Sequence, residues 1–337
     1  MKAVVCYGDN ILNFEEKPKP VPRNREVLVK VSAAGICGSD HGIFSGNGPS
    51  WVQYPVIPGH ECSGVVEEIG ERVTGFVKGE GVVVDNYLFC GKCKYCKTGR
   101  YFLCEEHAEI GMTIDGGFAE YCVVPDTNLV KLPEFLSSVE SVLVEPLATA
   151  LRACHDSRMC AGDNIVVIGC GPLGALIAQV SCLMGASVYL VGRGKRLEWI
   201  RNNLSVFAVD STRTGWVDIL RKEIGGGAEV IFEVSGSSDM IHTGTSLLKK
   251  TGRFILMGIT SGKSGRIPVD AIVLEEKEVI GRVSGMGMFE EAVRLIASEK
   301  IAPNSFITHR FSFSDYRKAI ETETKRIEGA MKVILVP

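Results

Sequence analysis

The most constraining feature of the sequence is a stretch over residues 165–191 that carries no charge and is interrupted near its start by GCGPLG. It divides into an apolar run (NIVVIG), a segment of helical length (PLGALIAQVSCLMG) and a second apolar run (ASVYLVG). Its length would suffice to span a bilayer. The early Gly and Pro residues, without a second such segment or a flanking aromatic belt, favour instead a buried strand, a helix and a second strand.

GCGPLG fits the pattern Gly-x-Gly-x-x-Gly in the context that a dinucleotide site requires, between a strand and a helix. Gly169 would permit the tight turn, Gly171 would let the backbone approach a pyrophosphate, and Gly174 would let the helix pack closely on the strand. The helix N-terminus would then attract the anion. An ordinary turn between strand and helix is the alternative. We predict that the cofactor is bound by Gly169, Gly171, Pro172, Leu173 and Gly174.

The pattern of the sequence changes near residue 150. Residues 1–150 contain short β-like runs broken by Gly and Pro, which is typical of a β-barrel or an irregular β domain. Residues 151–283 alternate apolar strands with segments of helical length, and this alternation predicts a parallel sheet with helices on both faces. After residue 284 a helix-like stretch leads to a final strand, MKVILVP.

Composition excludes several classes of protein. The chain has 337 residues, enough for about two domains. A hydrophobic fraction of 45% and a charged fraction of 23% are typical of soluble globular proteins. The net charge of -3 gives no indication of nucleic-acid binding. The N-terminus lacks the apolar core of a signal peptide, so we expect a cytoplasmic protein whose 12 cysteines are thiols or metal ligands.

Four cysteines lie close together in CGKCKYCKTGRYFLC: Cys90, Cys93, Cys96 and Cys104. Four thiolates can close a tetrahedral shell around a structural zinc ion and leave no open position. An iron–sulfur cluster also takes four cysteines, and unligated thiols are a third interpretation. We predict a structural zinc in a lobe over about residues 86–108.

A second set of possible metal ligands is spread along the chain. It comprises Cys37 in GICGSDHG, His60 and Glu61 in PGHECSG, and Glu145 in LVEPLATA. Three protein ligands with one exchangeable position make a catalytic zinc site. Taken singly, Cys37 could be a core thiol, His60 a turn residue and Glu145 an acid at a helix N-terminus. Their spacing alone does not join them.

Together these motifs resemble those of the zinc-containing medium-chain dehydrogenases, in order and over essentially the whole chain. GHECSGVVEEIGERV, residues 59–73, fits the zinc signature of that family, and the four-cysteine lobe and GCGPLG stand at the family's positions. CGSD and EPLATAL are most similar to the sorbitol and threonine dehydrogenase branch. Some dehydrogenases that form aminocyclitols share this pattern.

The resemblance implies an α/β plus β fold. A GroES-like β-barrel catalytic domain would comprise residues 1–150 and 284–337, and a Rossmann domain with a doubly wound parallel sheet, residues 151–283, would be inserted into it. The active site would lie in the cleft. The resemblance also implies two zinc ions per chain, a nicotinamide cofactor and a homodimer or homotetramer.

The implied activity is hydride transfer between the nicotinamide and the secondary alcohol of a polyol, sugar, sugar phosphate or aminocyclitol. A zinc ion held by Cys37, His60 and a carboxylate would polarise the substrate oxygen as a Lewis acid. Glu61 and Glu145 could bind the metal directly, hold its water or alternate. Ser39 matches the hydroxyl that passes the alcohol proton outward. Alternatives are a non-catalytic or a quinone-reductase-like member of the fold, but quinone reductases lack this set of ligands.

The chain departs from the family at the proton relay. The relay histidine commonly stands five residues after the zinc cysteine, where this chain has Gly42. His41 stands one position earlier and would serve after a local shift; otherwise water carries the proton, and His41 is a plain surface residue.

The end of the second strand bears on the choice of cofactor. In NAD sites an acid about 20 residues beyond the glycine turn accepts hydrogen bonds from the ribose 2′-hydroxyl. Here ASVYLV is followed by Gly192, Arg193, Gly194, Lys195 and Arg196. Guanidinium groups bind phosphate with paired donors. We therefore predict a preference for NADP(H), with Arg193 as the main phosphate ligand and Lys195 or Arg196 assisting. The alternative is that these cations are solvated and that NAD binds.

Overall fold

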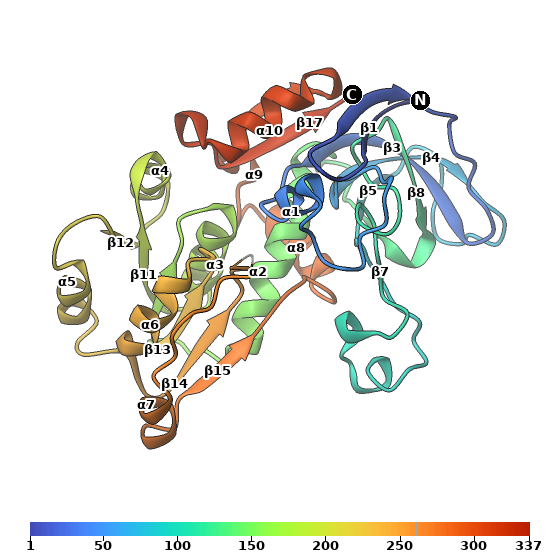
Figure 1. Ribbon diagram of the computed structural model, residues 1–337. Helices are drawn as coiled ribbons and strands as arrows, with labels where there is room; N and C mark the ends of the chain where they lie inside the picture. Colours follow the sequence, from blue (N-terminus) through green and yellow to red (C-terminus); the bar gives the residue numbers. More distant parts are fainter. Residues whose placement is uncertain (261) are drawn as a thin grey trace. The chain divides into compact units, whose positions relative to one another are not determined.

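The computed structural model describes residues 1–260 and 262–337. These residues form two compact units, Met1–Ala148 with Met286–Pro337, and Thr149–Gly285 (Figure 1). The second unit is thus inserted between two parts of the first. Within the described ranges no helix combines the length and apolarity needed to cross a membrane. The uncharged stretch 165–191 forms a strand, a glycine turn, a helix and a second strand, as its Gly and Pro residues predict.

The inserted unit contains a parallel sheet in the order β12-β11-β10-β13-β14-β15. Its strands are β10 (Asn164–Ile168), β11 (Ser187–Gly192), β12 (Phe207–Asp210), β13 (Ala228–Glu233), β14 (Leu248–Leu256) and β15 (Glu278–Gly281). Helices of the unit are α3 (Pro172–Leu183), α4 (Gly194–Asn203), α5 (Trp216–Glu223), α6 (Ser238–Leu247) and α7 (Val269–Leu274). The order is that of the doubly wound dinucleotide-binding sheet, and the predicted Rossmann fold is confirmed.

The glycine turn lies where the strand order reverses, between β10 and β13. Gly169 has a φ of 127°, and a Cβ there would lie 3.1 Å from the backbone nitrogen of Ser235, just beyond β13. A Cβ on Gly174 would collide with the carbonyl oxygen of Gly169. Only glycine at both positions lets α3 start this close to the sheet, and ligands of such folds bind at this point.

The first unit is built around a mixed sheet in the order β16-β17-β3-β4-β5-β9, with β8 also paired to β3. The strands are β3 (Glu26–Gly35), β4 (Glu61–Ile69), β5 (Gly81–Val84), β8 (Tyr121–Pro125), β9 (Leu129–Lys131), β16 (Ile307–Ser312) and β17 (Lys332–Val336). Small pairs are β1 (Lys2–Cys6) with β2 (Leu12–Glu16), and β6 (Tyr87–Leu88) with β7 (Ala108–Glu109). The C-terminal strand β17 therefore pairs with β3 from the N-terminal part of the chain.

The helices of the first unit are short. They are α1 (Asp40–Ser45), α8 (Phe289–Ala297), α9 (Pro303–Phe306) and α10 (Tyr316–Thr324), and α2 (Val144–Asp156) begins in this unit and continues into the other. Short 3₁₀ turns lie at Cys96–Thr98, Tyr101–Leu103, Asp126–Asn128, Glu140–Leu143, Phe313–Asp315 and Ile327–Gly329. The strand β3 is buried along most of its length and ends two residues before Cys37, so the sheet fixes the position of the first candidate ligand.

Candidate active site and metal centres

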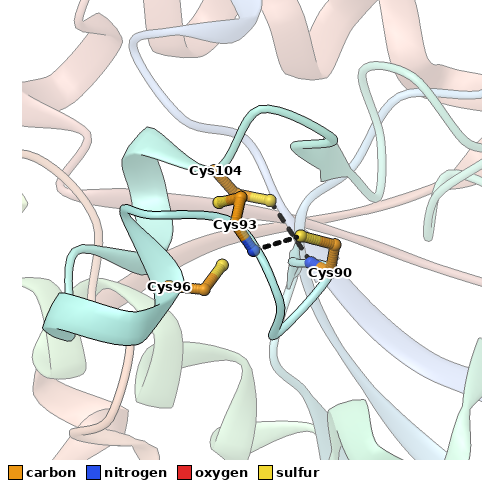
Figure 2. A group of neighbouring side chains, drawn as sticks. All are labelled: Cys90, Cys93, Cys96 and Cys104. Carbon is orange, nitrogen blue, oxygen red and sulfur yellow. Dashed lines mark hydrogen bonds between the residues drawn. The ribbon is translucent and has the colours of Figure 1, made fainter.

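The cysteines of the lobe come together in the structure (Figure 2). The sulfur atoms of Cys90, Cys93, Cys96 and Cys104 all lie within 4.8 Å of one another. A tetrahedral zinc with Zn–S bonds of about 2.3 Å needs sulfurs about 3.8 Å apart. An iron–sulfur cluster must fit between its sulfurs and needs them farther apart. The arrangement therefore fits a single ion.

Backbone N–H groups surround the lobe sulfurs. Those of Cys90 and Glu106 donate to Cys104 Sγ at 3.2 and 3.3 Å, and that of Cys93 donates to Cys90 Sγ at 3.4 Å. Such groups lower the pKa of Cys93 to about 6, whereas burial and the neighbouring Cys93 raise the pKa of Cys96 to about 12. Cys93 thus loses its proton readily, and its negative charge opposes ionisation of the neighbouring thiol. All four cysteines can be thiolates at this separation only with a cation among them.

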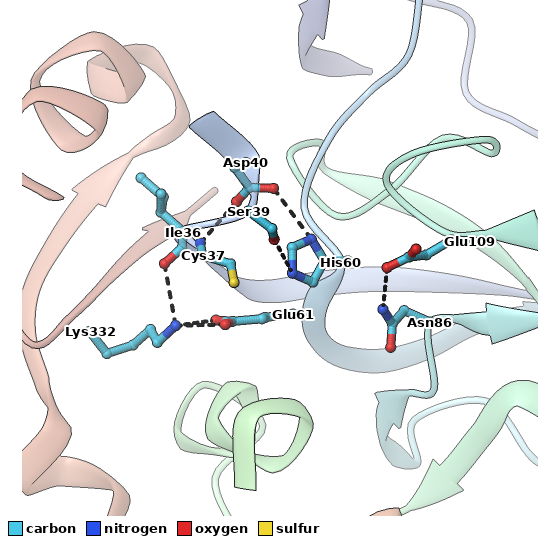
Figure 3. A network of polar contacts seen from close by, with 9 residues as sticks. All are labelled: Ile36, Cys37, Ser39, Asp40, His60, Glu61, Asn86, Glu109 and Lys332. Atoms are coloured by element: carbon cyan, nitrogen blue, oxygen red, sulfur yellow. Dashed lines mark hydrogen bonds and ion pairs between the residues drawn. The ribbon is translucent and has the colours of Figure 1, made fainter. Parts of the chain in front are cut away.

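Cys37, His60 and Glu61 form the second group (Figure 3). Cys37 follows β3, His60 directly precedes β4, and Glu61 is the first residue of β4. Because β3 and β4 are antiparallel and Gly35 pairs with Glu61, the end of β3 and the start of β4 lie side by side. One ligand atom from each of the three residues lies within 4.8 Å of the others. The sheet register thus joins residues that sequence spacing could not join.

Asp40 orients the imidazole of His60, and sequence analysis missed it. Its buried carboxylate accepts a hydrogen bond from the backbone nitrogen of Cys37 at 2.9 Å. The other oxygen lies 3.3 Å from His60 Nδ1, a charge contact outside good hydrogen-bond geometry. Burial opposes the charged imidazole, but Asp40 and Cys37 raise the pKa of His60 well above its usual value. Carboxylates that hold the second nitrogen in this way are common partners of metal-binding histidines. The only feature of the sequence that could have indicated this role is the Asp in the motif CGSD.

Ser39 and Glu145 flank this group. Ser39 Oγ lies 3.4 Å from His60 Nε2, the ring nitrogen opposite Asp40. Glu145 is buried in the first turn of α2, outside the 4.8 Å group among the described residues. Burial raises the pKa of Glu145 to about 8, and the charge of His60 offsets part of that rise. A buried carboxyl of this kind loses its proton when a cation comes close.

Aromatic rings adjoin the group and had no sequence signal, because they are far apart in the chain. Ring contacts join Trp51, Tyr87, Phe102 and His107 at centroid distances of 5.1–6.3 Å. Glu109 lies beside them, accepts a hydrogen bond from Asn86 Nδ2 at 3.0 Å, and has a pKa raised to about 7 by burial. Burial and the charges of Glu109, Glu145 and Cys37 raise the pKa of Tyr87.

His41 contacts α10 through both of its ring nitrogens. Nε2 lies 2.5 Å from a carboxylate oxygen of Glu323, and Nδ1 lies 3.5 Å from the hydroxyl of Thr324. The pair with Glu323 raises the pKa of His41 against the opposing effect of burial. The group of possible metal ligands among the described residues does not include His41.

The cations after β11 surround the start of α4. Arg193 and Lys195 are exposed, whereas Arg196 is buried, and a Cβ on Gly171 would lie 3.7 Å from its Nη1 atom. A Cβ on Gly192 would collide with the sulfur of Cys170. The last residue of β11 therefore has no room for an acidic side chain.

Two family profiles match the chain, "Alcohol dehydrogenase GroES-like domain" over residues 23–134 and "Zinc-binding dehydrogenase" over residues 172–298. A sorbitol dehydrogenase from Halalkalibacterium halodurans is 33% identical over 345 residues, covering 100% of this chain and 99% of the relative.

Two solved structures extend the likeness to the whole fold. RspB from Escherichia coli, complexed with NADH, has a TM-score of 0.93 at 30% identity. A zinc-binding dehydrogenase from Sinorhizobium meliloti, bound to NADP, has a TM-score of 0.91 at 28% identity. Each match covers 100% of this chain and 99% of the other. The chain therefore belongs to the zinc-containing medium-chain dehydrogenase family, with a GroES-like domain, a Rossmann domain and relatives among the polyol dehydrogenases.

Proposed function

We propose that the protein is a zinc-dependent alcohol dehydrogenase that transfers a hydride between NADP(H) and a secondary alcohol of a polyol- or sugar-type substrate. The observation that carries this proposal is the group of Cys37, His60 and Glu61, with its imidazole held by Asp40. A quinone-reductase-like or non-catalytic protein of the same fold would have no need for such a group.

Cys37, His60, Glu61 and Glu145 would hold the catalytic zinc. A thiol, an imidazole and carboxyl groups make up a donor set that zinc accepts, and a cation at this place would favour loss of the Glu145 proton. When bound, zinc would supply a Lewis acid that stabilises negative charge on the substrate oxygen. The charge of Asp40 beside His60 Nδ1 favours a proton on that nitrogen, which would leave Nε2 to bind the metal.

The proton of the alcohol would leave through Ser39, because its hydroxyl lies beside His60 Nε2. Since both ring nitrogens of His41 contact α10, we assign the onward step to water and give His41 a structural role in joining α1 to α10.

The surroundings of the site offer hydrogen-bonding groups to a hydroxylated substrate. Burial raises the pKa of Glu109 to about 7 and that of Glu145 to about 8, so near neutral pH these carboxyls both donate and accept hydrogen bonds. A screen of polyols, aminocyclitols and sugar phosphates with both cofactors would identify the substrate class.

The preference for NADP rests on the inserted unit. Gly192 leaves no space for the acid that would bind a ribose 2′-hydroxyl, and Arg193, Lys195 and Arg196 supply positive charge at the same place. Solved relatives hold NADH in one case and NADP in another, so the fold alone does not decide between the two cofactors.

We expect two zinc ions per chain with different roles. Cys93→Ser should lose one zinc and lower the thermal midpoint of unfolding, because a closed site contributes to folding. Cys37→Ser should lose the other zinc and abolish turnover while the fold persists. The measurements are metal analysis and thermal unfolding, with Cys160→Ser, at an exposed cysteine outside both groups, as the control. Wild-type protein with fewer than two zincs would contradict this expectation.

Ser39→Ala should lower turnover by roughly 10²-fold, the range of general acid–base effects, if the hydroxyl moves the proton. Turnover is to be measured where the chemical step limits the rate. Ser45→Ala, at the last residue of the short helix α1 that begins just after Ser39, is the control and should change little. Near-wild-type turnover of Ser39→Ala would remove the residue from the mechanism.

The pair of His41 and Glu323 should make stability depend on pH. Because the folded pKa of His41 is raised, its contribution is fully present below its usual pKa of about 6.5 and is lost as the pH rises through the raised value. His41→Ala should therefore lower the free energy of unfolding by up to about 1 kcal/mol near pH 6 and by less near pH 9. Urea unfolding measures the difference. His309→Ala, whose ring contacts the hydroxyl of Thr308, is the control; an equal loss at both pH values for His41→Ala would argue against the pair.

Wild-type kcat/KM should be higher with NADP than with NAD. Arg193→Ala should lower the value for NADP by roughly 10- to 100-fold, since a hydrogen bond to a charged group contributes about 1.5–3 kcal/mol, and should leave the value for NAD unchanged. Arg201→Ala, at the exposed end of α4, is the control. A wild-type preference for NAD would defeat the proposal, and an unchanged NADP preference in Arg193→Ala would defeat the role of Arg193.

A further inference from the structure

Lys332 forms a buried ion pair with Glu61 (Figure 3). Its Nζ atom lies 2.7 and 2.5 Å from the two carboxylate oxygens and 3.3 Å from the carbonyl oxygen of Ile36. The side chains are 3% and 1% exposed. One ammonium group therefore binds both oxygens of a candidate metal ligand.

The sheet topology builds this contact. Lys332 begins β17 and Glu61 begins β4, and the end of β3 runs between these two strands. A Cβ on Gly35, the last residue of β3, would collide with Glu61 Oε2. The missing side chain at Gly35 thus leaves the space in which the carboxylate turns toward the lysine.

This contact weakens Glu61 as a metal ligand. A bond from Glu61 to zinc must use one of the oxygens that Lys332 already binds, and it brings a second cation toward the ammonium group. Cys37 and His60 carry no such restraint. Carboxylates and carbonyl oxygens that contact a metal ligand usually orient it and strengthen its bond to the metal. The positive charge of Lys332 instead weakens the bond that Glu61 can make.

We propose, on the basis of the zinc site proposed above, that Lys332 is a positioning residue that holds the Glu61 carboxylate back from the catalytic zinc. Glu61 then occupies a metal position only loosely, and the substrate oxygen can take that position. A purely structural ion pair is the competing explanation, since many buried pairs fix only the packing of the chain.

The test is the zinc dissociation constant of the full chain at the Cys37 site, measured by competition with a chelator. In Lys332→Met the freed carboxylate should bind the metal firmly, and zinc should bind at least about tenfold more tightly than in the wild type, the scale of second-shell effects on affinity. Lys332→Arg retains the charge and should remain near the wild type. Should Lys332→Met fold poorly, Lys332→Gln leaves a hydrogen-bond donor for Glu61 and should shift the affinity in the same direction.

A double-mutant comparison separates positioning from net charge. In the Glu61→Gln background, Lys332→Met should no longer tighten zinc binding. An equal tightening in that background, or no tightening in either Lys332→Met or Lys332→Gln, would overturn the proposal. Lys277→Met, at a buried lysine paired with Glu275 in the other unit, reports the general effect of removing such a lysine and should leave zinc affinity unchanged.

The zinc content of the wild type and of Cys37→Ser separates the proposed zinc site from the proposed role of Lys332. A wild type that loses one of its zincs on Cys37→Ser supports the metal site, and the lysine variants then decide the role of Lys332. A wild type without zinc at Cys37 would overturn both.

Discussion

The site depends on the pairing of β3 with β4 on one side and β17 on the other. This pairing brings together residues 37, 61 and 332, which come from the beginning and the end of the chain. Because a shift of one residue in a strand register turns every side chain to the opposite face, the register fixes which groups converge. The inserted unit interrupts the first unit in sequence without interrupting this sheet.

The strand pairing places several ionisable groups in the protein interior. An unpaired charge in the interior is costly because it has lost its contacts with water. The buried carboxyls of Asp40, Glu61, Glu109 and Glu145 share the region with Cys37, His60 and Lys332. The acidic groups outnumber the basic ones, and burial raises the pKa values of Glu109 and Glu145. A divalent cation would relieve this imbalance, which is the physical reason for proposing one here.

Local signals made the fold predictable and left the details of the site undetermined. The Gly-x-Gly-x-x-Gly turn and the alternating strands identified the Rossmann unit, because each of these features is formed by residues close together in the sequence. For the same reason, spacing alone was enough to group the lobe cysteines, Cys90, Cys93, Cys96 and Cys104. Lys332 and Glu109 were missed because their roles arise from strand pairing and burial over long sequence separations. Asp40 was missed although it stands beside Ser39, since its partner is 20 positions away in the chain.

The structure gives the two candidate carboxylate ligands different surroundings. Glu61 has an ammonium group on both oxygens, so its charge is already balanced before any metal binds. Glu145 is buried with a pKa raised to about 8, and a cation nearby would favour loss of its proton. Metal binding would thus change the protonation of Glu145 more than the contacts of Glu61. On this argument Glu145 responds to the charge of the metal, whereas Glu61 is restrained by Lys332, and the two acids that sequence analysis treated as equivalent have separate roles.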